Sequence, residues 1–247
     1  MKYTYCLSDI HGMIDHLIKA MRWIANDVAE TGADMSDVTI VFMGDYIDRG
    51  PASRAVLDTL MVMKDVSPPT VIILRGNHED LMLQALRYRS KTHEECWLAN
   101  GGLETLKNYE KKTVRGLYDD AIYEHLDFIE SMDLWYEDEQ RIYVHAGILG
   151  DTPGIGDHRA YLWARPADMR MWFENGRPFP EKLVVHGHTP FHPGYPGKTI
   201  CIDGGACFDK GHLKVVKFCD EHRDPINIAE IAQVRPTGMN DNKVQAA

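Results

Sequence analysis

Histidine, aspartate and asparagine residues recur beside glycine in five short segments of the sequence. The segments are SDIHG at 8–12, GDYIDRG at 44–50, RGNHE at 75–79, HAG at 145–147 and HGHT at 186–189. A mixed set of carboxylate, amide and imidazole groups suits Mn²⁺, Fe or Zn²⁺, whereas Ca²⁺ prefers oxygen ligands alone. The residue types therefore predict a metal site, provided that the fold brings the segments together.

Each segment on its own has a simpler structural explanation. Asp9 and Asn77 can cap helices, and His145 can be a hydrogen-bonded core histidine. Asp45 and Asp48 can form hydrogen bonds within turns. Short motifs also arise often by chance. Five such clusters in one chain are not expected from independent capping, so the functional interpretation is favoured.

Apolar runs that predict β-strands lead into the five segments. The predicted strands are 3–7, 38–43, 70–74, 141–147, 182–188, 199–205 and 212–218, and helical spacing of apolar residues predicts helices at 14–31 and 52–64. Strands that alternate with helices predict βαβ units and an α/β fold whose sheet is buried on both faces. Ligands of such sheets bind beyond the carboxyl ends of the strands, which is where the five segments lie.

The rest of the chain divides into three parts. Residues 80–132 are expected to form a helical insertion that covers one sheet face, and residues 148–180, rich in Gly, Pro, Trp and Arg, a long functional loop. From about residue 221 the sequence has few apolar anchors. We therefore predict one domain over 1–220 and a partly flexible C-terminal extension over 221–247.

Composition and charge limit the class of protein. The chain has 247 residues, 44% of them hydrophobic, which suffices for one large α/β domain. A formal net charge of -10 argues against a broad surface for nucleic acid or anionic membrane. The start, MKYTYCLSDIHG, lacks the apolar stretch of a signal peptide, and no segment approaches the ~20 apolar residues of a membrane span. We expect a cytoplasmic protein whose five scattered cysteines are reduced thiols.

The motifs DIHG, GDYIDRGP, LRGNHE, HAG and HGHTP, in this order, resemble those of the calcineurin-like metallophosphoesterase superfamily. More narrowly, GDYIDRGP with LRGNHE resembles the serine/threonine phosphoprotein phosphatases, and WLANGG with GHTP resembles their bacterial and phage members. The resemblance implies a four-layer α/β/β/α sandwich with two divalent metal ions at the carboxyl edge of its sheets. Mn²⁺ is the first expectation, with Fe and Zn²⁺ as alternatives.

The same resemblance implies a set of metal ligands. It implies that Asp9 and His11 bind the first metal and that Asn77, His145 and His188 bind the second. Asp45 is then expected to bridge the two metals. Two such ions would lower the pKa of a shared water, and the resulting hydroxide would attack phosphorus directly, without a phosphoenzyme. His186 lies two residues before His188 on the same strand face and is interpreted as a core residue; a one-residue change of register would exchange the two.

The resemblance also implies groups that bind phosphate and move a proton. Arg49, Arg75 and, with weaker support, Arg165 match phosphate-binding arginines, whose planar fork can hold two oxygens; ordinary salt bridges are the alternative. His78 matches the general acid that protonates the leaving oxygen, and Asp48 matches the residue that orients it.

Three functions are compatible with these motifs. The first is hydrolysis of phosphoserine and phosphothreonine in a phosphorylated protein partner, favoured by the pairing of YIDRGP with RGNHE. The second is hydrolysis of dinucleoside polyphosphates or RNA caps at the same two metals. The third is a metal-binding scaffold with little catalysis, which is disfavoured because every ligand position is filled.

Overall fold

The structure of the chain is a computed structural model that describes residues 1–119, 122–155 and 158–232. Its strands form two five-stranded sheets. In spatial order, the first sheet contains β10 (His222–Ala232), β9 (His212–Cys219), β1 (Tyr3–Leu7), β2 (Val38–Phe42) and β3 (Thr70–Ile73). The second contains β4 (Trp135–Glu137), β5 (Arg141–Val144), β6 (Leu183–His186), β8 (Thr199–Cys201) and β7 (Gly194–Tyr195). Both sheets combine parallel and antiparallel pairs.

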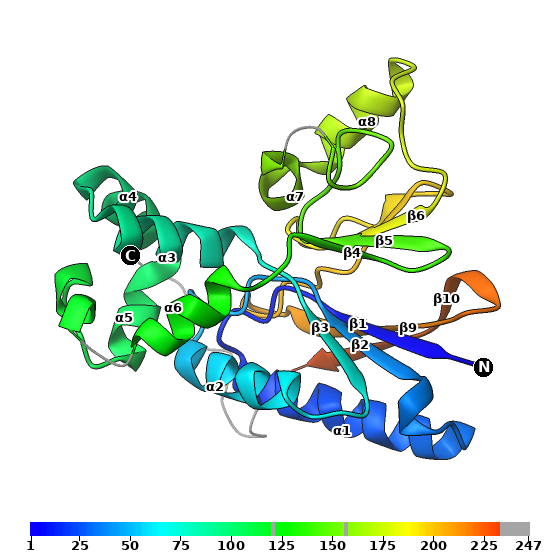
Figure 1. Cartoon of the computed structure of the whole chain (residues 1–247), viewed down its shortest axis with the longest axis horizontal. Helices are drawn as coiled ribbons and strands as arrows, with labels where there is room; N and C mark the ends of the chain where they lie inside the picture. Colours follow the sequence, from blue (N-terminus) through cyan, green and yellow to red (C-terminus); the bar gives the residue numbers. More distant parts are fainter. Residues whose placement is uncertain (120–121, 156–157, 233–247) are drawn as a thin grey trace, which may run out of the picture.

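The two sheets lie face to face between two layers of helices (Figure 1). Helices α1 (Ile14–Thr31) and α2 (Ser53–Lys64) cover the first sheet, and α7 (Arg159–Trp163) and α8 (Pro166–Glu174) lie on the side of the second. Successive side chains of β2 point to opposite faces of the first sheet and pack in different layers. Phe42 packs with the helix side of the first sheet, whereas Val41 packs with Tyr143 and Phe218 between the sheets. The predicted four-layer α/β/β/α sandwich is confirmed.

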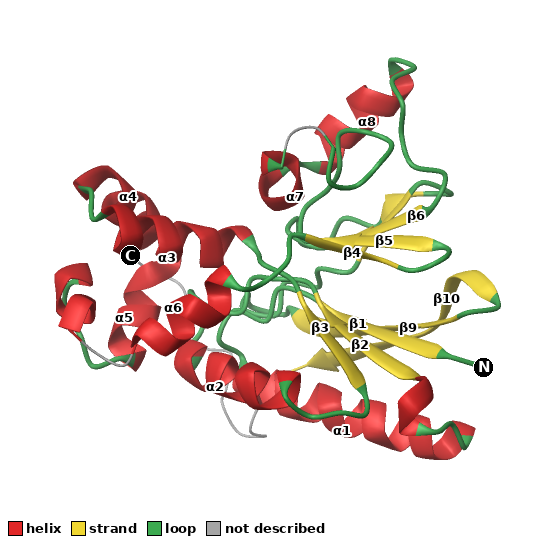
Figure 2. Cartoon of the chain, viewed as in Figure 1, coloured by secondary structure: helices red, strands yellow, loops and turns green. Residues whose placement is uncertain are grey.

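A helical insertion follows β3 (Figure 2). It consists of α3 (Asn77–Tyr88), α4 (Lys91–Trp97), a π-helical turn (Leu98–Gly102), α5 (Leu103–Asn108), a 3₁₀ helix (Val114–Asp119) and α6 (Ile122–Glu130). These helices lie beyond the carboxyl end of the first sheet, next to α2. The expectation that they cover a sheet face was wrong. The insertion therefore borders the edge where the five polar segments lie.

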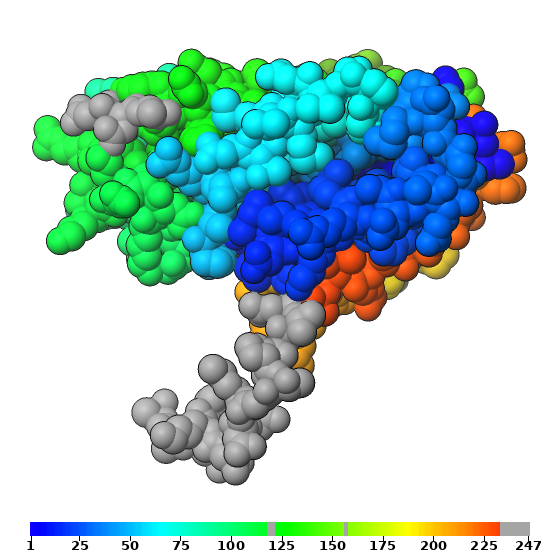
Figure 3. Space-filling model, turned by 90° about the horizontal axis from the view of Figure 1, so that it is seen from below, coloured from blue at the N-terminus to red at the C-terminus, as the bar shows by residue number. Residues whose placement is uncertain are grey.

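Two parts of the chain are more regular than the sequence analysis expected. The predicted loop at 148–180 contains α7 and α8, whose five and nine residues are too few for a clear helical period. Residues 222–232 form the strand β10, which pairs with β9 at His222 and again over 227–232, with an irregularity in between. Ile231 packs on the core beside α1, and Figure 3 shows the two elements next to each other at the surface. Residues 233–247 of the predicted extension lie outside the described residues.

Among the described helices, none is both long and apolar enough to cross a membrane.

Candidate active site

The loops that follow β1, β2, β5 and β6 are tied together by backbone hydrogen bonds. Asp9 N–H donates to the Gly44 carbonyl (3.1 Å), and His11 N–H to the Asp45 carbonyl (2.8 Å). Gly187 N–H donates to the His145 carbonyl (2.7 Å). Segments far apart in the sequence therefore meet at one sheet edge, as predicted.

The backbone of these loops is strained. Positive φ angles, which residues other than glycine rarely adopt, occur at Asp9 (55°), Asp45 (57°), Asp48 (69°), Arg49 (66°) and His188 (65°). Such conformations persist only where the surroundings hold them, and they cluster at functional sites. The strain thus points to the same edge as the motifs.

Glu79 supplies much of this support. Its carboxylate accepts hydrogen bonds from the backbone N–H groups of Asp45 (2.8 Å), Tyr46 (2.8 Å) and Ile47 (3.2 Å). It also accepts from Gly76 N–H at 3.0 Å. Glu79 lies in the first turn of α3, so one side chain joins the loop after β2 to the loop after β3. The prediction that Glu79 supports the loop is confirmed.

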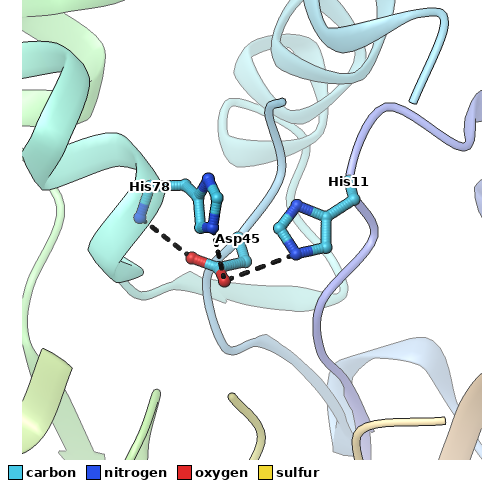
Figure 4. Close-up of side chains that lie close together, drawn as sticks. All are labelled: His11, Asp45 and His78. Carbon is cyan, nitrogen blue, oxygen red and sulfur yellow. Dashed lines mark hydrogen bonds and ion pairs between the residues drawn. The ribbon is translucent and has the colours of Figure 1, made fainter. Parts of the chain in front are cut away.

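Asp45 is shared by two groups of potential metal ligands. In the first group, its Oδ2 lies 3.5 Å from His11 Nε2 and 3.9 Å from His78 Nε2, and all three side chains are buried (Figure 4). In the second, its Oδ1 lies 3.4 Å from His145 Nε2, and His188 completes the set. This is the arrangement that a carboxylate bridging two cations requires.

Asn77 belongs to the second group. Its Oδ1 lies 2.9 Å from His145 Nε2 and 2.9 Å from His188 Nδ1. His145 Nδ1–H donates to the Met43 carbonyl (2.9 Å), which leaves a lone pair on Nε2 facing the Asn77 oxygen. Two opposed acceptors in a buried site are compatible with a cation between them. His186 lies outside this set, so the structure favours His188 as the ligand.

The electrostatics of the site also fit divalent cations. Burial raises the pKa of the Asp45 carboxyl well above its usual value, and the neighbouring Asp9 and Glu79 carboxylates raise it further. Burial lowers the pKa of His145 to about 3 and that of His188 to about 2, so both imidazoles are neutral ligands at physiological pH. Bound positive charge would compensate the buried carboxylates and accept these lone pairs.

Asp9 is buried at the same edge but lies outside both groups. Its carboxylate accepts hydrogen bonds from the Ser8 hydroxyl and from His188 N–H (3.1 Å). Burial and the nearby Asp203 raise the pKa of Asp9 well above its usual value. The sequence analysis missed Asp203, although it lies near the end of the predicted strand 199–205 and directly precedes two glycines. The ligand role of Asp9 stays a prediction.

His78 and Asp48 form a buried pair. His78 Nδ1 lies 2.7 Å from Asp48 Oδ2, so the ring donates to the carboxylate and its Nε2, which has no hydrogen-bond partner, faces Asp45. Asp48 is fully buried. An imidazole held in this way can deliver a proton from Nε2 to a group at the metal site.

The structure places the three predicted phosphate-binding arginines differently. Arg49 Nη1 donates to His11 Nε2 (2.7 Å), and since a cation on that nitrogen would exclude this bond, metal binding would free the guanidinium for phosphate. Arg165 lies beside the second group, where its charge helps to lower the pKa of His188. Arg75 turns away, because it donates to the carbonyls of Glu130 (2.8 Å) and Met132 (3.3 Å) at the end of α6.

Comparisons with known proteins agree with this geometry. The family model for calcineurin-like phosphoesterases matches residues 3–227. The chain is 26% identical over 235 residues to the asymmetrical bis(5'-nucleosyl)-tetraphosphatase PrpE of Anoxybacillus flavithermus, covering 86% of this chain and 89% of that protein. It is 25% identical over 190 residues to the catalytic subunit of serine/threonine-protein phosphatase 6 of Drosophila melanogaster, covering 70% of this chain and 54% of the relative.

A solved structure supports the fold. A Saccharomyces cerevisiae protein serine/threonine phosphatase superimposes with a TM-score of 0.58 at 16% identity, covering 96% of this chain and 82% of the other. The matched family model spans the five motif segments and every described strand except the end of β10. The chain therefore belongs to the calcineurin-like phosphoesterase family.

Proposed function

We propose that the protein hydrolyses phosphoserine and phosphothreonine monoesters in phosphorylated proteins, with Mn²⁺ as its metal. The observation that carries this proposal is the buried His78–Asp48 pair with a free Nε2 at the site. A seryl or threonyl alkoxide is a poor leaving group that needs a proton as the bond to phosphorus breaks, whereas a nucleotide phosphate leaves readily. A positioned acid is thus worth most on a phosphate monoester of an alcohol.

The side chains divide the work of this reaction. Two divalent cations, when bound, would supply positive charge to the phosphoryl group and activate a water molecule for attack. The residues that would hold them are Asp45, which both groups share, with His11 in the first group and Asn77, His145 and His188 in the second. Arg49 and Arg165 are the arginines that can reach the phosphoryl oxygens. His78 Nε2 gives its proton to the leaving oxygen while Asp48 holds Nδ1–H.

A second candidate function is hydrolysis of a dinucleoside polyphosphate. Two phenylalanines beside the site are strongly exposed, Phe191 by 60% and Phe208 by 46%. They converge on Gly205, where an added Cβ would lie 2.7 Å from the ring of Phe191 and 3.2 Å from that of Phe208. Arg49 lies over the Phe208 ring at 5.8 Å. An exposed aromatic surface next to a phosphate-binding arginine can stack a nucleobase.

The two candidates are separated by direct competition between substrates. The protein is stripped of metal, reloaded with Mn²⁺, and its kcat/KM is measured on a phosphothreonine peptide and on diadenosine tetraphosphate. We expect the peptide to be preferred. A strong preference for the dinucleotide, together with a raised KM for it in Phe208→Ala, would instead support the second candidate.

A further inference from the structure

The Asp48 carboxylate receives more hydrogen bonds than its partnership with His78 requires. Trp97 Nε1–H lies 3.1 Å from Oδ1 and 3.0 Å from Oδ2, and the Thr105 hydroxyl donates to Oδ1 at 2.6 Å. His78 donates to Oδ2 at 2.7 Å. All four side chains are buried, so none of these bonds competes with water. Trp97 and Thr105 come from the helical insertion, outside the five motif segments.

We propose that Trp97 and Thr105 are positioning residues that fix the Asp48 carboxylate and thereby aim His78 Nε2 at the leaving group. This inference deepens the proposed function and rests on it. A carboxylate with a single partner can rotate about its terminal torsion, which would change the direction of the His78 ring. Hydrogen bonds from three side chains, His78, Trp97 and Thr105, restrict this rotation. Because the indole and the hydroxyl are neutral, they hold the carboxylate without supplying a cation that would compete with His78.

Thr105, together with Ser53, also holds the backbone of Asp48. Its N–H lies 3.0 Å from both Thr105 Oγ1 and Ser53 Oγ. Thr105 Oγ1 also lies 3.1 Å from Ser53 Oγ, and because its own proton goes to Asp48 Oδ1, the Ser53 hydroxyl is the donor in that contact. Since φ of Asp48 is 69°, this contact stabilises a conformation that an aspartate rarely adopts. One threonine therefore restrains both the backbone and the carboxylate of Asp48.

The π-helical turn at Leu98–Gly102 accounts for the position of Trp97. An added Cβ at Gly102 would lie 2.8 Å from indole Cε2 of Trp97, so only glycine lets the ring pack there. At Gly101, φ is 110° and the carbonyl accepts from Arg49 N–H at 3.3 Å. The segment WLANGG thus contacts both Asp48 and Arg49. π-Helical turns inside helices often occur at functional sites, and this one links the insertion to the acid and to a phosphate-binding arginine.

The test separates loss of the acid from loss of the fold. Trp97→Phe keeps a ring but removes the N–H donor, and Thr105→Val keeps the shape but removes the hydroxyl. Rates of the Mn²⁺-loaded proteins are compared on phenyl phosphate, which needs an acid, and on 2,4-dinitrophenyl phosphate, which does not. We expect each variant to lose about 10-fold or more on phenyl phosphate and less than about 2-fold on the dinitrophenyl ester. Thr105→Ser should restore the phenyl phosphate rate.

Trp172→Phe is the matched control. Its indole also donates a hydrogen bond, to the Pro178 carbonyl at 2.8 Å, but within α8 and the loop that follows it. Both rates should stay unchanged in this variant, and metal content should be equal in all proteins. Equal losses on the two esters in Trp97→Phe, or no loss on either, would overturn the inference.

A second measurement does not depend on catalysis. In the metal-free protein, the buried Nδ1 proton of His78 should give a downfield proton NMR signal that His78→Asn abolishes. Trp97→Phe and Thr105→Val should shift or broaden this signal, and an unchanged signal would contradict the positioning role. If the protein cleaves only dinucleotides, the proposed function is refuted, but the NMR signal still tests whether Trp97 and Thr105 position His78.

Discussion

The side chains at the metal site are buried so deeply that their charge states differ from those in water. Burial raises the pKa of Asp45 and lowers those of His11 and His145, so the protein alone favours neutral groups there. Bound divalent cations would lower the pKa of the carboxylate, so that it is ionised, and they would bind the neutral imidazoles.

Replacing His78 by asparagine tests the role of the acid. The second ligand group does not include His78, and His11 and Asp45 remain in the first, so the metal content of His78→Asn should equal that of the unmodified protein. Turnover on poor leaving groups should fall by ~10² to 10⁴, the usual contribution of a positioned acid. Metal analysis and rates on the phosphothreonine peptide check both expectations, and an unchanged rate would remove His78 from this role.

His186 should make the stability of the metal-free protein depend on pH. Burial lowers its pKa from 6.5 to about 4. Between pH 6.5 and pH 4, His186 is therefore protonated in the unfolded chain but not in the folded protein. The free energy of unfolding is thus highest above pH 6.5 and decreases as the pH falls toward 4. His186→Leu should reduce the loss between pH 7.5 and 4.5 by about 2 to 3 kcal/mol, measured by urea unfolding. A variant that loses as much stability as the unmodified protein would contradict this.

At the scale of elements, five strands position site residues by ending where they do: β1, β2, β3, β5 and β6. The loops after β1 and β2 carry Asp9 and Asp45, and α3 begins at Asn77, so that its first turn contains Asn77, His78 and Glu79. Strand β10 has a different role, because it lies at the free edge of the first sheet and packs only part of its side chains. Its contribution is to stability.

Two isoleucines of β10 provide a test of that contribution. Ile231 packs against the core beside α1, whereas Ile228 is 50% exposed. Ile231→Asn places an amide against apolar side chains and should lower the free energy of unfolding by about 1 to 3 kcal/mol. Ile228→Asn is the matched control and should change it by no more than about 0.5 kcal/mol. Urea denaturation measures both, and equal effects would show that β10 does not pack as described.

At the scale of the whole molecule, the metal site joins the two sheets. Asp9 and Asp45 follow strands of the first sheet, and His145 and His188 follow strands of the second. His188 N–H donates to Asp9 across a separation of 179 residues. Cations held by residues of both sheets therefore stabilise the packing of one sheet against the other.

Mn²⁺ should accordingly raise the melting temperature of the metal-free protein. A free metal concentration of about 100 times Kd stabilises a folded protein by about 2.7 kcal/mol per site. Asp45→Asn weakens both groups at once and should abolish most of the shift seen by differential scanning fluorimetry. Arg87→Ala is a control, because Arg87 pairs with Asp127 and Glu130 on the exterior. A full Mn²⁺ shift in Asp45→Asn would contradict the bridging position.

The four layers were implied by the resemblance of the motifs to a known family, whereas the residue patterns by themselves determined the alternation of strands and helices and the residue types at the strand ends. These features depend on local patterns of apolar residues and on glycine. The tertiary structure decided the direction of individual side chains: Arg75 turns to the end of α6, and Trp97 and Thr105 reach Asp48 from the insertion. It also decided that β10 is a strand, through its pairing with β9. Such contacts depend on how segments distant in the chain pack together, and no local pattern encodes that geometry.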